Sequence, residues 1–194
     1  MGFFDRTSTV LIQLNARLQP IHRGDLEDAL IERVLPTIPK FRVAGGGTGV
    51  DKEGRVTGCG IEVVVPKPEL EASLVELASA LNTLGVPRGS KLITPPKRSI
   101  PVGMAEGISV SLPRIVTPER TDARQLHHSE PLDHALDLLG AGLGAEGRVW
   151  SWQFLPTGAE LAIYGADSER LRELVTSHLP REGDFARYRI SEIA

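Results

Sequence analysis

Apolar and polar side chains alternate in several short segments of this chain, which predicts strands with one buried face. Val10, Ile12 and Leu14 fall on one side of an extended segment near the start of the sequence. Residues 61–66, IEVVVP, are rich in β-branched side chains and end at a proline, so they predict a buried strand. Similar patterns predict strands over residues 90–94, 107–115 and 185–193, and a hairpin over residues 148–165.

Other segments carry apolar residues at the spacing of an α-helix. In the first, residues 24–36, Asp25 is predicted to cap the helix and Pro36 to end it. The second, residues 68–85, has the clearest stripe, formed by Leu70, Leu74, Leu77, Leu81 and Leu84. Two more helices are predicted over residues 131–143 and 166–180.

Residues 41–60, FRVAGGGTGVDKEGRVTGCG, are so rich in glycine that they raise the question of a phosphate-binding loop. Neither G-x-x-x-x-G-K-[ST] nor G-x-G-x-x-G fits any register of this stretch. The element that follows is a strand, whereas both motifs place the phosphate at the start of a helix. We therefore predict a β-hairpin that turns near Asp51 and Gly54, with the other glycines marking a bulge or a close approach.

The predicted elements repeat in the order β-α-β-β-α-β in each half of the chain. This order is that of the ferredoxin-like unit, an antiparallel sheet with its helices on one face. We predict an α+β protein with two such units, over residues 7–96 and 97–194, joined by a Pro- and Gly-rich connector at 95–107. The alternative is a single mixed α+β domain.

Composition narrows the classes of function. The chain is 41% hydrophobic and 24% charged, with a net charge of -3. This mild acidity argues against nucleic acid and anionic membranes as partners. The apolar run at residues 10–14 is too short for a signal peptide, and the single cysteine, Cys59, fits a reducing compartment, so we expect a cytoplasmic protein. Because no cofactor motif is present, we expect no cofactor.

The segment LHHSEPLDH is the first candidate for chemistry. It contains His127, His128 and His134, together with Glu130 and Asp133, which are side chains that bind zinc or iron. The spacing does not form H-E-x-x-H, and the leucine stripe of the predicted helix turns His134 away from the core. The three histidines are therefore only weak metal candidates, and a polar loop entering a helix is the competing interpretation.

The strand RVWSWQF is the second candidate. Trp150, Trp152 and Phe154 alternate, so we expect the three rings on one face, and Arg187 and Arg189 alternate on the last predicted strand. These five residues are our candidates for an interaction surface. Stacking on RNA bases would require the RNP1 pattern, which this sequence lacks. The competing interpretation, which the pattern favours, is that the rings fill the core or the interface between the two sheets, because Ser151 and Gln153 occupy the opposite face.

Two smaller features complete the candidates. Cys59 has no nearby base in the sequence, so a small residue in the hairpin is favoured over a nucleophile. Arg88, Ser90 and Lys91 would form a small anion site if their side chains converged, but the sequence favours a helix stop at residues 85–87 followed by a turn at Gly89.

The sequence favours a non-enzymatic protein that binds a protein partner or a second copy, such as a regulatory protein or the immunity member of a toxin pair. The alternative is a small-molecule enzyme or sensor. Its ligand would lie in a cleft between the units, with His127, His128 and His134 and a carboxylate such as Glu62 or Glu160 as acid and base.

Overall fold

The structure, a computed structural model, describes residues 6–115 and 129–193. Contacts divide the chain into two compact units. The first comprises Met1–Val50 and Val56–Ala105, and the second comprises Asp51–Arg55 and Glu106–Ala194. The division after Ala105 falls inside the segment expected to connect the two units.

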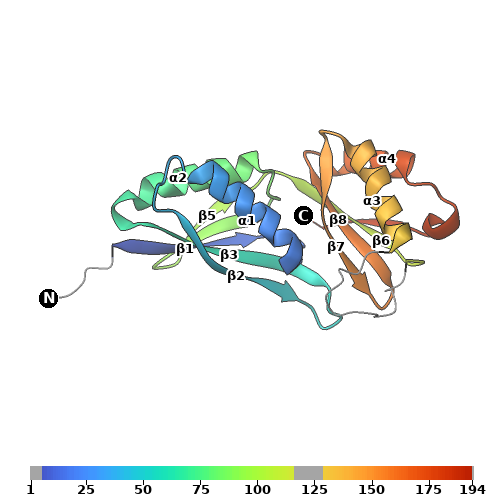
Figure 1. The fold of residues 1–194 in the computed structure, drawn as a ribbon, viewed down its shortest axis with the longest axis horizontal. Coiled ribbons are helices and arrows are strands. Elements are labelled where there is room, and N and C mark those ends of the chain that lie inside the picture. Colours follow the sequence, from blue (N-terminus) through green and yellow to red (C-terminus); the bar gives the residue numbers. More distant parts are fainter. Residues whose placement is uncertain (1–5, 116–128, 194) are drawn as a thin grey trace. The chain divides into compact units, whose positions relative to one another are not determined.

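The first unit is a five-stranded antiparallel sheet with two α-helices (Figure 1). The strands lie in the order β2-β3-β1-β4-β5. A short 3-10 helix, Lys67–Glu69, leads into the second α-helix. In chain order the elements are β1 (Thr7–Leu14), α1 (Pro20–Val34), β2 (Arg42–Val50), β3 (Val56–Pro66), α2 (Leu70–Thr83), β4 (Ser90–Thr94) and β5 (Arg98–Val102).

The two central strands of this sheet, β1 and β3, carry its core. Ile12 pairs with Ile61 and Val10 with Val63, and all four side chains are fully buried. The helices cover this side of the sheet (Figure 1) and contribute the buried leucines Leu26 and Leu30 from α1 and Leu74, Leu77 and Leu81 from α2. Burial of one face in this way fixes the register of the strands.

The second unit is a four-stranded antiparallel sheet in the order β7-β8-β6-β9. In its core, Ile108 of β6 and Leu161 and Ile163 of β8 pack against leucines of α3 and α4. The α-helices pack together beside the sheet (Figure 1). In chain order the elements are β6 (Glu106–Leu112), α3 (Glu130–Leu143), β7 (Gly147–Leu155), β8 (Gly158–Gly165), α4 (Ser168–His178), a 3-10 helix (Gly183–Phe185) and β9 (Arg189–Glu192).

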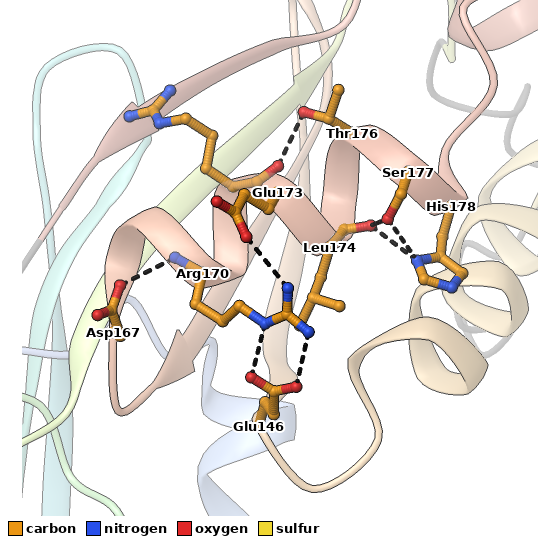
Figure 2. Close-up of polar contacts among 9 residues, drawn as sticks. Glu146, Asp167, Arg170, Glu173, Leu174, Thr176, Ser177 and His178 are labelled. Atoms are coloured by element: carbon orange, nitrogen blue, oxygen red, sulfur yellow. Dashed lines mark hydrogen bonds and ion pairs between the residues drawn. The ribbon is translucent and has the colours of Figure 1, made fainter.

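The start of α4 is held by local polar contacts (Figure 2). The Asp167 side chain caps the helix by accepting a hydrogen bond of 2.9 Å from the Arg170 amide, as its position before the helix predicts. The Arg170 guanidinium donates two hydrogen bonds, of 2.8 and 3.1 Å, to Glu146 in the turn before β7, and these bonds hold the pKa of Glu146 below its usual value. The bidentate pair therefore ties that turn to α4.

Both units have the strand order and connections of the ferredoxin-like arrangement, so the predicted α+β fold is confirmed. The glycine-rich segment forms the predicted hairpin of β2 and β3. Asp51 accepts hydrogen bonds from the amides of Glu53 and Arg55, and Gly54 adopts a positive φ of 80°. The register shifts next to Gly45 and after Gly49, as expected for glycines at a bulge.

Three predicted boundaries are wrong. The first helix begins at Pro20 rather than near Asp25, because the fixed φ of proline suits the first turn of a helix. The expected connector contains β5, whose residues 98–102 pair with β4 and extend the sheet. The last strand covers only Arg189–Glu192, and residues before it, including Arg187, lie in a 3-10 helix and a turn.

Across residues 6–115 and 129–193, no helix has both the length and the apolar character that crossing a membrane requires.

The core of the first unit can be tested by changing isoleucine to alanine at one buried site and at one exposed site. Ile61→Ala should lower the free energy of unfolding by about 2–5 kcal/mol, because Ile61 is fully buried and the truncation leaves a cavity. Ile21 is 50% exposed, so Ile21→Ala should change it by less than about 0.5 kcal/mol. Urea unfolding followed by circular dichroism measures both, and equal effects at the two sites would contradict the assigned core.

Candidate functional site

The side of the first sheet that faces away from α1 and α2 is exposed and carries an unusual set of residues. Because Val10, Ile12 and Leu14 point toward the helices, Leu11 and Gln13 point to the other side. Pairing across the strands then defines two rows on that side, which we call the open face. One row is Gly45, Glu62, Leu11, Ile93 and Ser99, and the next is Gly47, Gly60, Gln13, Lys91 and Pro101.

The glycines leave one half of the open face without side chains. A Cβ atom placed on Gly47 would meet nothing within 4 Å, and one on Gly45 would meet only Glu62 Oε2, at 4.0 Å. Gly60 lies beneath Leu11, whose Cδ1 would be 3.2 Å from such an atom. Gly46 points to the opposite side, where a side chain would collide with the Gly60 carbonyl and crowd the Arg23 guanidinium. Only the alternate glycines therefore belong to the open face.

Two hollows lie on the open face, on either side of Leu11. The first has a volume of about 370 Å³ and is lined by residues that include Gln13, Lys91 and the glycines of β2 and β3. The second, of about 390 Å³, is lined by residues that include Glu62 and Ile93, and Leu11 lines both hollows. Each volume falls in the range of sites that receive a small ligand or an inserted side chain.

Polar side chains on the open face are available for new contacts. Within the described residues, the side chains of Gln13, Glu62 and Lys91 make no hydrogen bond or ion pair. Some other charged residues of the same unit are paired: Arg23 binds Glu27 at 2.7 Å, and Arg98 binds Glu71 at 2.7 Å. Contacts made by Gln13, Glu62 or Lys91 to a partner would thus break no bond within the described chain.

The segment Arg88–Lys91 does not gather into the small anion site considered from the sequence. Ser90 is buried on the helix side of β4, where its hydroxyl donates a hydrogen bond of 2.7 Å to the Pro87 carbonyl. The Arg88 carbonyl accepts a hydrogen bond of 2.9 Å from the Asn15 side chain. Lys91 points to the open face instead, because successive residues of a strand face opposite sides.

Cys59 is buried in β3 and is unsuited to nucleophilic chemistry. Its side chain is 5% exposed. Removal from water raises the pKa of the Cys59 thiol to about 12, an effect that the nearby Arg23 charge opposes only in part. The thiol is therefore protonated at neutral pH, and the thiolate is the form that reacts.

The histidine and carboxylate candidates are distributed over both units. His134 is exposed on α3, and its ring meets the Phe185 ring edge-on at 5.7 Å, whereas His127 and His128 lie outside the described residues. Glu62 lies on the open face of the first unit. Glu160 is buried in β8 of the second, where it accepts hydrogen bonds of 2.7 Å from Ser109 and 2.8 Å from Arg55. Over the described ranges, no group of three or more His, Cys, Asp or Glu side chains has the geometry of a metal site.

The prediction that Trp150, Trp152 and Phe154 share one face is wrong. A bulge in β7 between Val149 and Ser151 inserts an extra residue, so the alternation is broken at Trp150. The ring centroids of Trp150 and Tyr164 lie 5.3 Å apart. The Arg148 Cζ atom lies over the Trp150 ring, 4.6 Å from its centroid. Trp152 and Phe154 contact each other at 5.8 Å and pack half-buried against the core.

Arg187 and Arg189, which were expected to alternate on the last strand, do not lie on the same element. Arg187 lies in a turn, and only Arg189 is on β9. Sequence reasoning overlooked the open face, although one signal for it was present. Leu11 is an apolar residue on the side of β1 that the pattern of Val10, Ile12 and Leu14 assigns to solvent.

Comparisons with known proteins add little to this picture. No family model matches the sequence, and no curated protein matches it. Solved structures that resemble it include the regulatory subunit of aspartate kinase from Thermus thermophilus, at 14% identity and a TM-score of 0.28 over 90% of this chain and 94% of that one. Two other solved structures also resemble this chain. The TM-scores of all three are too low to support an argument about function.

One of these is a DUF3240 family protein from Shewanella baltica, at 24% identity and a TM-score of 0.25 over 40% of this chain and 79% of that one. The other comprises the first two RRM domains of the yeast poly(U) binding protein Pub1, at 13% identity and a TM-score of 0.27 over 96% of this chain and 99% of that one. The fold assignment rests on the strand order and connections.

Burial of Cys59 predicts low reactivity. At pH 8 the folded protein should react with a thiol reagent at least about 100-fold more slowly than the protein in denaturant, because burial both shields the sulfur and suppresses the thiolate. The rate for the unfolded chain should level off just above pH 9, whereas the folded rate should keep rising toward pH 12, the direction set by the raised pKa of Cys59. Equal rates in the two states at pH 8 would show that the thiol is accessible and ionised.

Proposed function

We propose that this protein is a non-enzymatic, cytoplasmic binding protein that holds a protein partner on the open face of its first unit. The observation that carries the proposal is the open space above Gly45 and Gly47, next to side chains that have no partner within the described chain. The sequence has a single cysteine, which cannot form an internal disulfide, and this supports the cytoplasmic part of the proposal.

The arrangement of the open face suits contact with a protein. The glycines let a partner approach the backbone closely. Leu11 and Ile93 are half-buried and give the surface an apolar centre, while Glu62, Gln13 and Lys91 supply polar groups around it. An apolar centre with a polar rim is the usual composition of a protein interface.

The described residues give less support to the enzyme or sensor alternative. The His134 ring packs against Phe185 rather than against a carboxylate, and Glu160 binds Ser109 and Arg55. A role as a regulatory protein or as the immunity member of a toxin pair stays a prediction, and the identity of the partner decides it.

The proposal predicts that one bulky side chain on the open face prevents binding. Gly47→Tyr adds a ring where there is free space, at a strand position that suits an aromatic residue, so the fold should be retained. The control is Gly140→Tyr, the same change on α3, where a Cβ atom also meets nothing within 4 Å.

Affinity capture from the native host, read by mass spectrometry, should recover a stoichiometric protein with the wild type and with Gly140→Tyr, but about tenfold less with Gly47→Tyr. If the captured protein is the host's own copy of this chain, that copy counts as the protein partner. Equal capture by the two variants would show that the partner binds elsewhere, and no stoichiometric partner in any sample would end the proposal.

A further inference from the structure

We propose that the partner on the open face is a second copy of this chain, in a twofold dimer in which Glu62 of each copy pairs with Lys91 of the other. This inference rests on the proposed function because it uses the same surface. It adds the identity of the partner and the residues that recognise it.

Glu62 and Lys91 lie on the open face on opposite sides of β1. Glu62 pairs with Leu11 on one side of β1, and Lys91 pairs with Gln13 on the other side. Because Leu11 and Gln13 are two residues apart on the same strand, the acid and the base lie diagonally across β1 on the same face. Among the described residues neither charge has an ion-pair partner.

An acid and a base placed in this way are complementary to a copy of themselves. A twofold axis that lies in the plane of the face, at right angles to the line joining Glu62 and Lys91, brings each charge opposite its counterpart in the second copy. The same operation forms two ion pairs at once, as in any isologous interface. Sheets packed face to face lie about 10 Å apart, a gap that an extended lysine and an extended glutamate bridge together.

Apolar side chains lie between the two charges. Leu11 stands beside Glu62, covers Gly60 and lines both hollows, and Ile93 is its direct neighbour on β4. In the proposed dimer the Leu11 and Ile93 side chains of the two copies meet close to the axis, where they lose contact with water. The charges flank this apolar centre and restrict its orientation, because an arrangement that placed Lys91 opposite Lys91 would bring like charges together.

Charge-reversal variants test both the partner and the pairing. E62K alone puts lysine opposite lysine twice, and K91E alone puts glutamate opposite glutamate twice. Both residues lie on the surface and neither change affects the core, so circular dichroism should confirm that the variants fold. Light scattering after size-exclusion chromatography should then show a dimer for the wild type and, because like charges repel, an association at least about tenfold weaker for each variant.

Two further samples, a double variant and a mixture of the two single variants, make the test specific for a second copy. The double variant E62K/K91E restores both pairs with their signs exchanged, so it should dimerise within about threefold of the wild type. An equal mixture of the E62K protein with the K91E protein should form a heterodimer, because each lysine then meets a glutamate. A partner other than this chain would not produce recovery on mixing.

The outcomes separate this inference from the proposed function. A wild-type chain that stays monomeric over the whole concentration range overturns the dimer, as does a mixture that stays monomeric. If capture from the host still depends on Gly47 in that case, the open face binds a different protein and the proposed function stands. If a dimer forms but Gly47→Tyr and both reversals leave it intact, the dimer uses another surface and the inference is wrong.

Discussion

Burial of alternate residues in β1 and β3 against α1 and α2 is the constraint on which the first unit depends. Val10, Ile12, Ile61 and Val63 are fully buried on the helix side. Because side chains alternate along a strand, a slip of one residue would turn this set toward solvent, so the register is strongly determined. The composition of the open face is a consequence of the same constraint, since it places Leu11, Gln13 and Glu62 on the side that the helices leave exposed.

The glycine-rich hairpin has a structural explanation that also bears on function. Gly46 is needed on the helix side, where a side chain would collide with the Gly60 carbonyl. Gly45 and Gly47 meet no such obstacle on the open face, so packing among the described residues does not require them to be glycine. Glycines at these two positions leave room for another surface to approach the backbone closely.

Much of the fold could be predicted from the sequence because its signals are local. The leucine stripe of α2, the cap at Asp167 and the turn at Gly54 each depend on residues close together in the chain. The bulge at Trp150 and the pairing of β5 with β4 depend on neighbouring strands, so alternation alone predicted the wrong face for Trp150 and missed β5. Lys91 and Glu62 come to lie on the same face only because their strands pair with β1, which no spacing in the sequence reveals.

Chemical labelling of lysines in the native host tests most directly whether the open face is occupied. An amine reagent applied to a fresh lysate and to dilute purified protein would be compared at Lys91, on the open face, and at Lys40, which is exposed in the turn before β2. The account predicts that labelling of Lys91 in the lysate falls well below its value in the dilute protein while labelling of Lys40 is unchanged. Equal labelling of Lys91 in the two samples would contradict the claim that this face binds a partner.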